Sequence, residues 1–284
     1  MAEGRFRGPA SATLLAVAVC TILYLYRVHP DFPLIVAANR DELYKRPARA
    51  PFWHAGDPAL LAGVDLQAGG SWLGANLSGL LVGLTNQRTN RLPDPALRSR
   101  GEVVMSALRA RRVSEVCEQL QALRPSEYNP FNLLFGDADR LCVAYSRPRA
   151  ARVEIEEAPQ GIAVLPNDRI GAPGFPKAER AVSLAHTLRG QPWDRLSSGL
   201  ASVLADHALP ALQQVPQPPP GSFFDHDTAR RLQAICLHGE AYGTCCASII
   251  ALRPGELVHY LHADGPACRT PFVELAQSTD AAGA

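Results

Sequence analysis

Two parts of this sequence carry residues whose types and spacing could do chemistry together. Cys20 lies in an apolar run at residues 19–24, and a polar Asn-Arg-Asp-Glu cluster follows at residues 39–42. A cysteine at the start of a mature chain carries a thiol with a reference pKa of about 8.5 and an α-amine with one of about 7.7–8.0. The amine can therefore take the proton of the thiol near neutral pH, so that nucleophile and base belong to one residue.

Such a site also needs supporting polar groups. A carboxylate must orient the ammonium group, and donors must face the developing oxyanion, each worth about 3 kcal/mol of the barrier. The sequence offers Asp41 as the carboxylate and Asn86 and Asn167 as the donors. Plainer roles compete with these, because cysteine is often buried in a strand and asparagine and aspartate are common in turns.

Residues 1–19 must be absent from the mature chain if Cys20 is to have a free amine, and three interpretations of this segment compete. In the first, it is a secretory signal with a basic start at Arg5 and Arg7 and an apolar segment at 12–19 that ends at Cys20, as a lipoprotein signal does. Val19 fits a lipoprotein cleavage site poorly. In the second, it is a membrane anchor, but the apolar run 12–26 is shorter than the roughly 18 residues that mark a membrane span.

The third interpretation is a start site placed too far upstream. Lysine occurs only at Lys45 and Lys177 whereas arginine is abundant, which indicates GC-rich coding DNA, where GTG start codons that read as valine are common. Val19 would then be the initiator, and its removal would leave Cys20 with a free α-amine. We expect this third interpretation, with residues 1–19 as an extension and 20–277 as one domain.

The composition is that of a globular chain without a polyanionic partner. The 284 residues are 47% hydrophobic and 19% charged, and the net charge is +1, which gives no electrostatic case for binding nucleic acid or an anionic membrane. Seven cysteines form an odd set without framework spacing, which favours reduced thiols in the cytoplasm over a secreted disulfide scaffold.

Strand patterns dominate the chain and alternate with helical ones. Pattern and turn residues predict strands at 20–28, 33–38, 69–74, 79–86, 131–135, 141–145, 152–156, 161–165, 248–252 and 256–261. Helices are predicted at 101–123, 177–188 and 196–209, and a proline-rich loop at 213–221. This order predicts a layered α/β fold with antiparallel sheets.

Several short motifs resemble those of the NRDE family, which is named for its Asn-Arg-Asp-Glu motif. The matches run in order along the chain from residue 20 and comprise Cys20-Thr21-Ile22-Leu23, Asn39-Arg40-Asp41-Glu42, Gly70-Ser71-Trp72-Leu73-Gly74, Leu84-Thr85-Asn86, Phe131-Asn132-Leu133-Leu134 and Tyr242-Gly243-Thr244. This family includes the transport and Golgi organisation proteins of eukaryotes and is similar in its opening to choloylglycine hydrolases and penicillin acylases. The resemblance implies a four-layer αββα sandwich of the N-terminal-nucleophile hydrolase type and a chain that begins Met-Cys.

The resemblance also implies roles for five residues, which form the predicted catalytic set. Cys20 would be the nucleophile, Asp41 would hold its α-amine, Arg40 would lie near the thiolate, and Asn86 and Asn167 would donate to the oxyanion. Two features depart from the choloylglycine hydrolase pattern. Arg40 and Asp41 are adjacent and so face opposite ways on a regular strand, and Cys245-Cys246 stand where a late arginine is expected.

Metal and nucleotide sites are not expected. Cys236, His238, Cys245 and Cys246 invite a zinc interpretation, but their spacing matches no common ligand pattern, so we expect structural thiols and no metal. The glycines at 69, 70 and 79 precede no helix with Lys-Ser/Thr, so they are turn residues and not a phosphate loop.

Two functions of different classes follow. The first is a cysteine amidohydrolase of the N-terminal-nucleophile type, acting on a small amide without a cofactor. The second is a non-catalytic binding or trafficking protein for haem or a lipid-like ligand, because a retained fold does not guarantee retained chemistry. In either case we expect a cytoplasmic protein with a small-molecule partner, no nucleic acid and no stable membrane insertion.

The first hairpin gives a geometric expectation. If its turn is centred between Pro30 and Asp31, antiparallel partners have residue numbers that sum to 61, which places Cys20 opposite Asp41. Ile22 would lie opposite Asn39, and Val28 opposite Pro33. Asp41, Asn86 and Asn167 would then converge on Cys20 at one rim of the sandwich.

Overall fold

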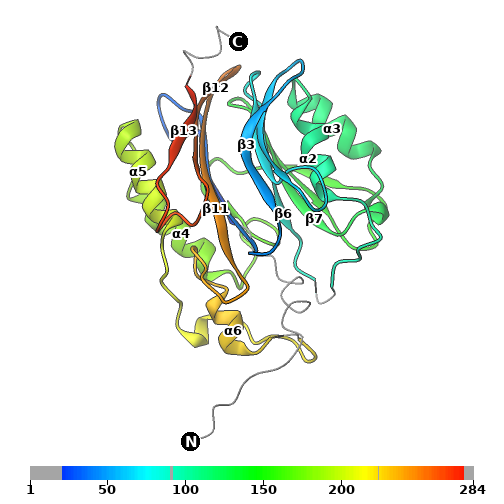
Figure 1. Ribbon diagram of the computed structural model, residues 1–284, viewed down its shortest axis with the longest axis vertical. Helices are drawn as coiled ribbons and strands as arrows, with labels where there is room; N and C mark the ends of the chain where they lie inside the picture. Colours follow the sequence, from blue (N-terminus) through cyan, green and yellow to red (C-terminus); the bar gives the residue numbers. More distant parts are fainter. Residues whose placement is uncertain (1–20, 90–91, 223, 278–284) are drawn as a thin grey trace, which may run out of the picture.

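Two antiparallel sheets pack face to face in this protein, and helices cover the outer face of each (Figure 1). We describe a computed structural model for residues 21–89, 92–222 and 224–277. The layers run α4 and α5, first sheet, second sheet, α2 and α3 (Figure 1). The four-layer αββα sandwich expected from the sequence is therefore confirmed.

The first sheet has six strands in the order β10-β1-β2-β11-β12-β13. The second has seven strands in chain order, β3 to β9. The strands of the first sheet are β1 (Thr21–Tyr26), β2 (Leu34–Leu43), β10 (Gly161–Leu165), β11 (Tyr242–Arg253), β12 (Glu256–Ala263) and β13 (Val273–Gln277). Those of the second are β3 (Ala48–His54), β4 (Leu60–Asp65), β5 (Leu73–Asn76), β6 (Leu81–Asn86), β7 (Phe131–Gly136), β8 (Leu141–Ser146) and β9 (Glu154–Glu157).

Three apolar layers follow from the two-residue period of the strands. In β1 and β2, the side chains of Ile22, Tyr24 and Val36 face the second sheet, and those of Leu23 and Ile35 face the helices. The helices are α2 (Arg100–Leu108), α3 (Val113–Ala122), α4 (Pro176–His186), α5 (Trp193–Leu204) and α6 (His226–Arg231), with short 3₁₀ turns at Pro125–Glu127 and Leu212–Gln214. No helix in the described ranges is long and apolar enough to cross a membrane.

The register of the first hairpin differs from the expected one by one residue. Thr21 pairs with Asn39 and Tyr26 pairs with Leu34, so partner numbers sum to 60 (21 + 39), and Ile22 lies opposite Ala38 instead of Asn39. The connection contains an odd number of residues, 27–33, and is closed by a hydrogen bond of 2.7 Å from the Arg27 amide to the Pro33 carbonyl oxygen. The expected turn centred between two residues was therefore wrong, as was the pairing of Val28 with Pro33.

The helix predicted at 101–123 is two helices, because a buried asparagine ends the first. The side-chain amide of Asn76 donates to the carbonyl oxygens of Leu108 and Ala110, at 2.8 Å each. These bonds satisfy the end of α2, and the chain turns before α3. Strands β3, β4 and β13 were not predicted from the sequence. In β3, apolar and polar residues do not alternate along the whole strand, and only one of its residues is buried, so the usual strand pattern is missing.

Candidate functional site

Four strand ends meet at one rim of the sandwich and position most of the predicted site residues. β1 begins there at Thr21, which pairs with Asn39 near the polar end of β2. On its other side β1 pairs with the end of β10, with Ile22 opposite Leu165. β6 of the second sheet ends at the same rim, since the Thr85 hydroxyl donates to the Pro166 carbonyl oxygen at 2.8 Å.

The structure brings the two predicted oxyanion donors together. The side-chain Nδ2 of Asn167 donates to the backbone oxygen of Asn86 at 2.8 Å, and the Arg88 amide donates to the Asn167 backbone oxygen at 2.7 Å. Asn167 is 4% exposed and follows β10, whereas Asn86 ends β6. These bonds tie the two sheets together at the rim and fix the orientation of the Asn167 amide.

Arg40 lies on the face of β2 that is turned toward the second sheet. Its Nη2 is 3.3 Å from an Asp65 oxygen and 3.8 Å from a Glu42 oxygen, and its guanidinium carbon is 4.5 Å from the centre of the Trp72 ring. Arg46 shares the Asp65 carboxylate at 2.6 Å. The Arg40 guanidinium is therefore held in place by carboxylates and an aromatic ring.

Asp41 lies on the opposite face of β2, among helix α4 and strand β11. The Thr244 hydroxyl donates to its Oδ1 at 2.6 Å, and the Lys177 ammonium lies 4.0 Å from its Oδ2. Both charged side chains of this pair are fully buried. Burial raises the pKa of Asp41 to about 6, even though the Lys177 charge and the Thr244 hydrogen bond oppose the rise.

Sequence reasoning missed Lys177, although the chain held a signal for it. The chain has 2 lysines and 26 arginines (28 − 2), so a lysine is an unusual choice of cation here. Lys177 also occupies the first turn of α4, where a positive charge is disfavoured by the helix dipole. A lysine at such a position indicates a specific anionic partner, and that partner is Asp41.

Two cavities open at the rim and share Asn86. The larger, about 720 Å³, is lined by both charged and apolar side chains, including those of Arg40, Asp65 and Trp72. The smaller, about 220 Å³, lies between Asn167, Phe175 and the proline-rich segment 215–220. Arg40, Asn86 and Asn167 thus line two adjoining cavities. Asp41 is buried on the other face of β2.

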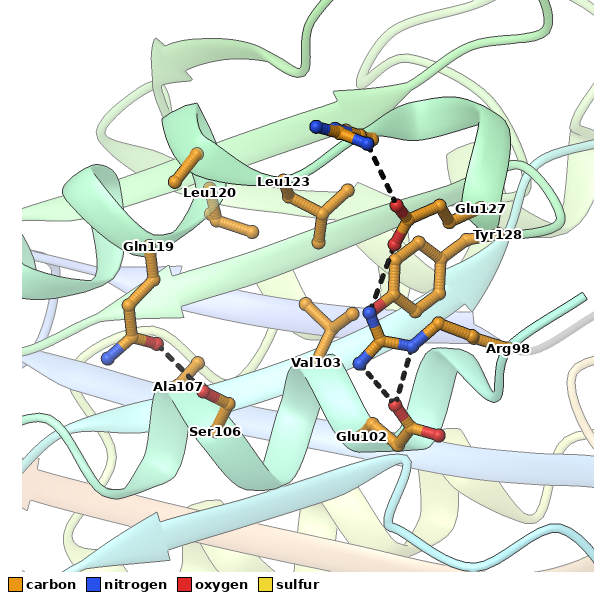
Figure 2. Close-up of a pocket in the computed structure, with 12 residues that line it drawn as sticks. Arg98, Glu102, Val103, Ser106, Ala107, Gln119, Leu120, Leu123, Glu127 and Tyr128 are labelled. Atoms are coloured by element: carbon orange, nitrogen blue, oxygen red, sulfur yellow. Dashed lines mark hydrogen bonds and ion pairs between the residues drawn. The ribbon is translucent and has the colours of Figure 1, made fainter.

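Another cavity, of about 280 Å³, lies between α2 and α3 and holds none of the predicted residues (Figure 2). Its charged groups neutralise one another: Arg98 is 2.9 Å from Glu102 and 3.0 Å from Glu127. These side chains are largely exposed, so the ion pairs are screened by water. We therefore place the candidate site at the rim.

Strand β11 has a bulge beside Arg40, at the point where a late arginine was expected. Thr244 pairs with Asp41 and Cys246 pairs with Arg40, which leaves Cys245 as the extra residue. The Cys245 thiol lies 3.5 Å from the Glu42 carbonyl oxygen, and burial raises its pKa. β-bulges re-aim side chains and are common next to functional sites.

Cys20 lies outside the described residues. The pairing of Cys20 with Asp41 was expected from a register that differs from the observed one by one residue. The expected convergence of Asp41 with Asn86 and Asn167 is wrong, because Asp41 is buried on the other face of β2 with Lys177 and Thr244. The position of Cys20 at the rim stays a prediction. The segment 1–19 lies outside the described residues as well.

The NRDE-like motifs predicted a sandwich of the N-terminal-nucleophile type with a polar rim. Comparisons with known proteins identify the family. The sequence profile described as Transport and Golgi organisation 2 matches residues 19–263. The chain belongs to this family.

Individual relatives agree with this membership. The Transport and Golgi organization protein 2 homolog of Bos taurus is 30% identical over 250 residues, which cover 82% of this chain and 88% of the relative. The Transport and Golgi organization 2 homolog of Mus musculus is 29% identical over 254 residues, with the same coverage.

Among solved structures, a mutant of the conjugated bile acid hydrolase from Clostridium perfringens aligns with a TM-score of 0.47 and 10% identity, over 90% of this chain and 92% of that chain.

Proposed function

We propose that this protein is a cysteine amide hydrolase whose nucleophile is Cys20 with a free α-amine. The observation that carries the proposal is the position of Thr21, which begins β1 at the rim where Arg40, Asn86 and Asn167 lie. A peptide bond joins Cys20 to Thr21, and consecutive Cα atoms are about 3.8 Å apart. Cys20 is therefore joined directly to a residue that lies at the rim.

The proposed reaction uses these groups in two steps. The α-amine takes the thiol proton, the sulfur bonds to the amide carbon, and the oxyanion accepts a hydrogen bond from Asn167. The carbon–nitrogen bond then breaks, the ammonium proton passes to the leaving amine, and a thioester remains. The α-amine takes a proton from water as the water oxygen adds to the thioester carbon, the sulfur–carbon bond breaks, the proton passes to the sulfur, and the acid leaves.

Arg40 and Asn167 are assigned different tasks. The Arg40 guanidinium lines the larger cavity and would stabilise the thiolate through its positive charge. A side-chain amide has two N–H groups, one of which Asn167 donates to the Asn86 carbonyl oxygen. The other is the one that we assign to the oxyanion.

The decisive test combines the intact mass of the protein made from its native gene with a burst assay. We expect a chain that begins at Cys20, carries no lipid and releases one equivalent of amine product from a library of small amides. Cys20→Ala should abolish the burst, whereas Cys117→Ser, in α3 on the outer side of the second sheet, should keep it. Detection of Met1 peptides would remove the free amine, and a diacylglycerol mass would block the thiol; either result would overturn the proposal.

Asn167 can be tested separately from the nucleophile. Asn167→Ala should lower kcat by roughly a hundredfold and leave KM nearly unchanged, because the donor acts mainly in the transition state. Asn129→Ala is a suitable control, since Asn129 lines the larger cavity but bonds to the backbone of Asp94. An unchanged kcat in folded Asn167→Ala would exclude Asn167 from the site.

A second candidate function is a non-catalytic carrier of haem or a lipid-like ligand. The observation that favours it is the buried pair of Asp41 and Lys177, because a carboxylate neutralised by lysine is less able to hold an α-ammonium group. Cys245 and Cys246, in place of the late arginine, also favour it, as does membership of the Transport and Golgi organisation 2 family. A saturable absorbance change on haem titration, together with no burst on any amide, would decide for this function.

A further inference from the structure

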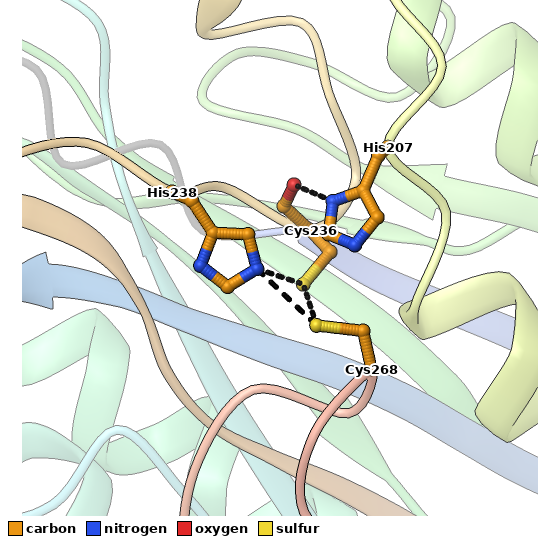
Figure 3. Close-up of side chains that lie close together, drawn as sticks. All are labelled: His207, Cys236, His238 and Cys268. Carbon is orange, nitrogen blue, oxygen red and sulfur yellow. Dashed lines mark hydrogen bonds between the residues drawn. The ribbon is translucent and has the colours of Figure 1, made fainter.

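Two histidines and two cysteines from three separate segments come together beside the first sheet. They are His207, which follows α5, Cys236 and His238, which precede β11, and Cys268, between β12 and β13 (Figure 3). Each offers one ligand atom, and these four atoms all lie within 4.8 Å of one another. None of them belongs to the rim described above.

The spacing of these atoms matches a tetrahedral zinc site. With zinc–sulfur bonds of about 2.3 Å and zinc–nitrogen bonds of about 2.0–2.1 Å, a tetrahedron separates two sulfurs by about 3.8 Å and a sulfur from a nitrogen by about 3.6 Å. The sulfurs of Cys236 and Cys268 are 3.7 Å apart. The Nε2 of His238 lies 3.2 Å from the Cys268 sulfur and 3.9 Å from the Cys236 sulfur.

Neighbouring groups orient the ligands. The Nδ1 of His207 lies 3.0 Å from the carbonyl oxygen of Cys236. When Nδ1 carries the proton and donates to that oxygen, Nε2 is left with the lone pair that a metal needs, which is the usual support of a metal-bound histidine. Cys236 is 1% exposed, and its backbone amide donates to the backbone carbonyl oxygen of Asp206 at 2.9 Å. His207 and Cys236 are thus bound to each other's segments.

We propose that these four side chains bind one zinc ion in a closed tetrahedral site. This replaces the sequence-based expectation of structural thiols without a metal, which grouped Cys236 and His238 with Cys245 and Cys246. Thiolate and imidazole ligands in a tetrahedral arrangement favour zinc over magnesium or calcium, which take oxygen ligands. Four protein ligands leave no open position for a water or substrate, so the ion has a structural role.

The role of such an ion follows from the segments that it joins. The segment after α5, the segment before β11 and the connection between β12 and β13 are far apart in the sequence and carry little regular structure at the ligands. A metal that binds all three stabilises the folded state, because the unfolded chain has no preformed site. Removal of the ion should therefore lower the Tm without unfolding the sheets at room temperature.

The full chain tests this directly. Protein expressed with zinc and purified without chelator should contain one zinc ion per chain, and Cys268→Ser and His207→Ala should each lose most of it. Cys117→Ser, which changes a thiol in α3, should keep the full metal content. If the ligand variants fail to fold, the wild-type chain gives a second measurement: a chelator should lower its Tm, and added zinc should restore it.

Cobalt(II) makes the geometry visible. Chelator-treated wild-type chain should take up one cobalt(II) ion and show the strong ligand-field bands of a tetrahedral site and thiolate-to-cobalt charge-transfer bands. The charge-transfer bands should weaken in Cys268→Ser and stay in Cys117→Ser. A wild-type chain that binds neither metal, or one isolated with a disulfide between Cys236 and Cys268, would overturn the proposal.

Discussion

Arg40 and Asp41 are neighbours on β2, yet they occupy opposite electrostatic environments. Arg40 faces the second sheet, lines a cavity of about 720 Å³ and lies near the carboxylates of Asp65 and Glu42. Asp41 faces α4, where it is fully buried with Lys177 and bonded to Thr244. The end of β2 thus carries a positive charge that faces a cavity and, on the other face, a negative charge that is buried in the protein interior.

The difference teaches which side of the strand is available for chemistry. Arg40 lies beside the cavity and can contact a ligand there. Its charge interacts with Asp65 and Glu42, and Arg46 also pairs with both carboxylates, so the loss of Arg40 is partly compensated. Asp41 and Lys177 are fully buried, so each charge is stabilised by its partner and not by water. We therefore expect function on the Arg40 face and stability on the Asp41 face.

The largest expected effect separates the two faces by stability. Lys177→Met removes one half of a fully buried ion pair and leaves Asp41 as a buried carboxylate. Such a change typically costs about 3–5 kcal/mol of unfolding free energy, which urea denaturation at pH 8 would measure. The loss should be smaller at pH 5, where Asp41 takes up a proton.

The chain contains a matched control for this prediction. Lys45 is the other lysine and is exposed, so Lys45→Met should change the unfolding free energy by no more than about 0.5 kcal/mol. Equal losses in the two variants would show that the Lys177 pair contributes no more than a surface charge.

Much of the architecture could be predicted from the sequence. The strand and helix patterns predicted a layered α/β fold with antiparallel sheets, because the period of apolar residues depends on which face is buried. The resemblance of the motifs to the NRDE family implied the αββα sandwich. The hairpin register could not be read, since one extra residue in the connection 27–33 reverses which faces meet. The division of helix 101–123 depends on Asn76, whose bonds to Leu108 and Ala110 link positions far apart in the sequence.

The sequence predicted the individual residues of the candidate site better than it predicted how they are arranged in space. Adjacency alone indicated that Arg40 and Asp41 face opposite ways, and the structure has them so. The contact of Asn86 with Asn167 joins two strand ends that come together only in the folded sheets. Local signals indicate that Lys177 has an anionic partner, but they do not say that this partner is Asp41. The meeting of His207 with Cys268 is likewise a long-range contact that no local pattern encodes.

A smaller loss is expected on the cavity face. Arg40→Met removes a charge whose partner Asp65 keeps Arg46 at 2.6 Å and backbone donors at Gln67 and Ala68. We expect a cost of about 1–2 kcal/mol, from the lost hydrogen bond and the contact with Trp72. Chemical denaturation beside Lys177→Met is the measurement. A loss as large as that of Lys177→Met would show that the two faces are equally closed to water.

The smallest effect concerns the titration of Asp41. Its pKa is raised to about 6 in the folded protein, whereas an unfolded aspartate has one of about 3.9. The folded state therefore holds the proton more tightly, and stability from this group falls as the pH rises from about 4 to about 6. Asp65 and Asp206 have lowered pKa values, so their contribution runs the other way and is lost only in more acidic solution.

A double variant isolates the contribution of Asp41. Asp41→Asn with Lys177→Met removes both buried charges and keeps the other carboxylates, so their titration cancels in the comparison with wild type. Between pH 5 and pH 7 the wild-type chain should lose about 1 kcal/mol of unfolding free energy relative to the double variant. A constant difference would mean that Asp41 is already ionised at pH 5, and that the attraction of Lys177 exceeds the cost of burial. The interior face of β2 would then resemble the cavity face, where Asp65 keeps its charge beside an arginine.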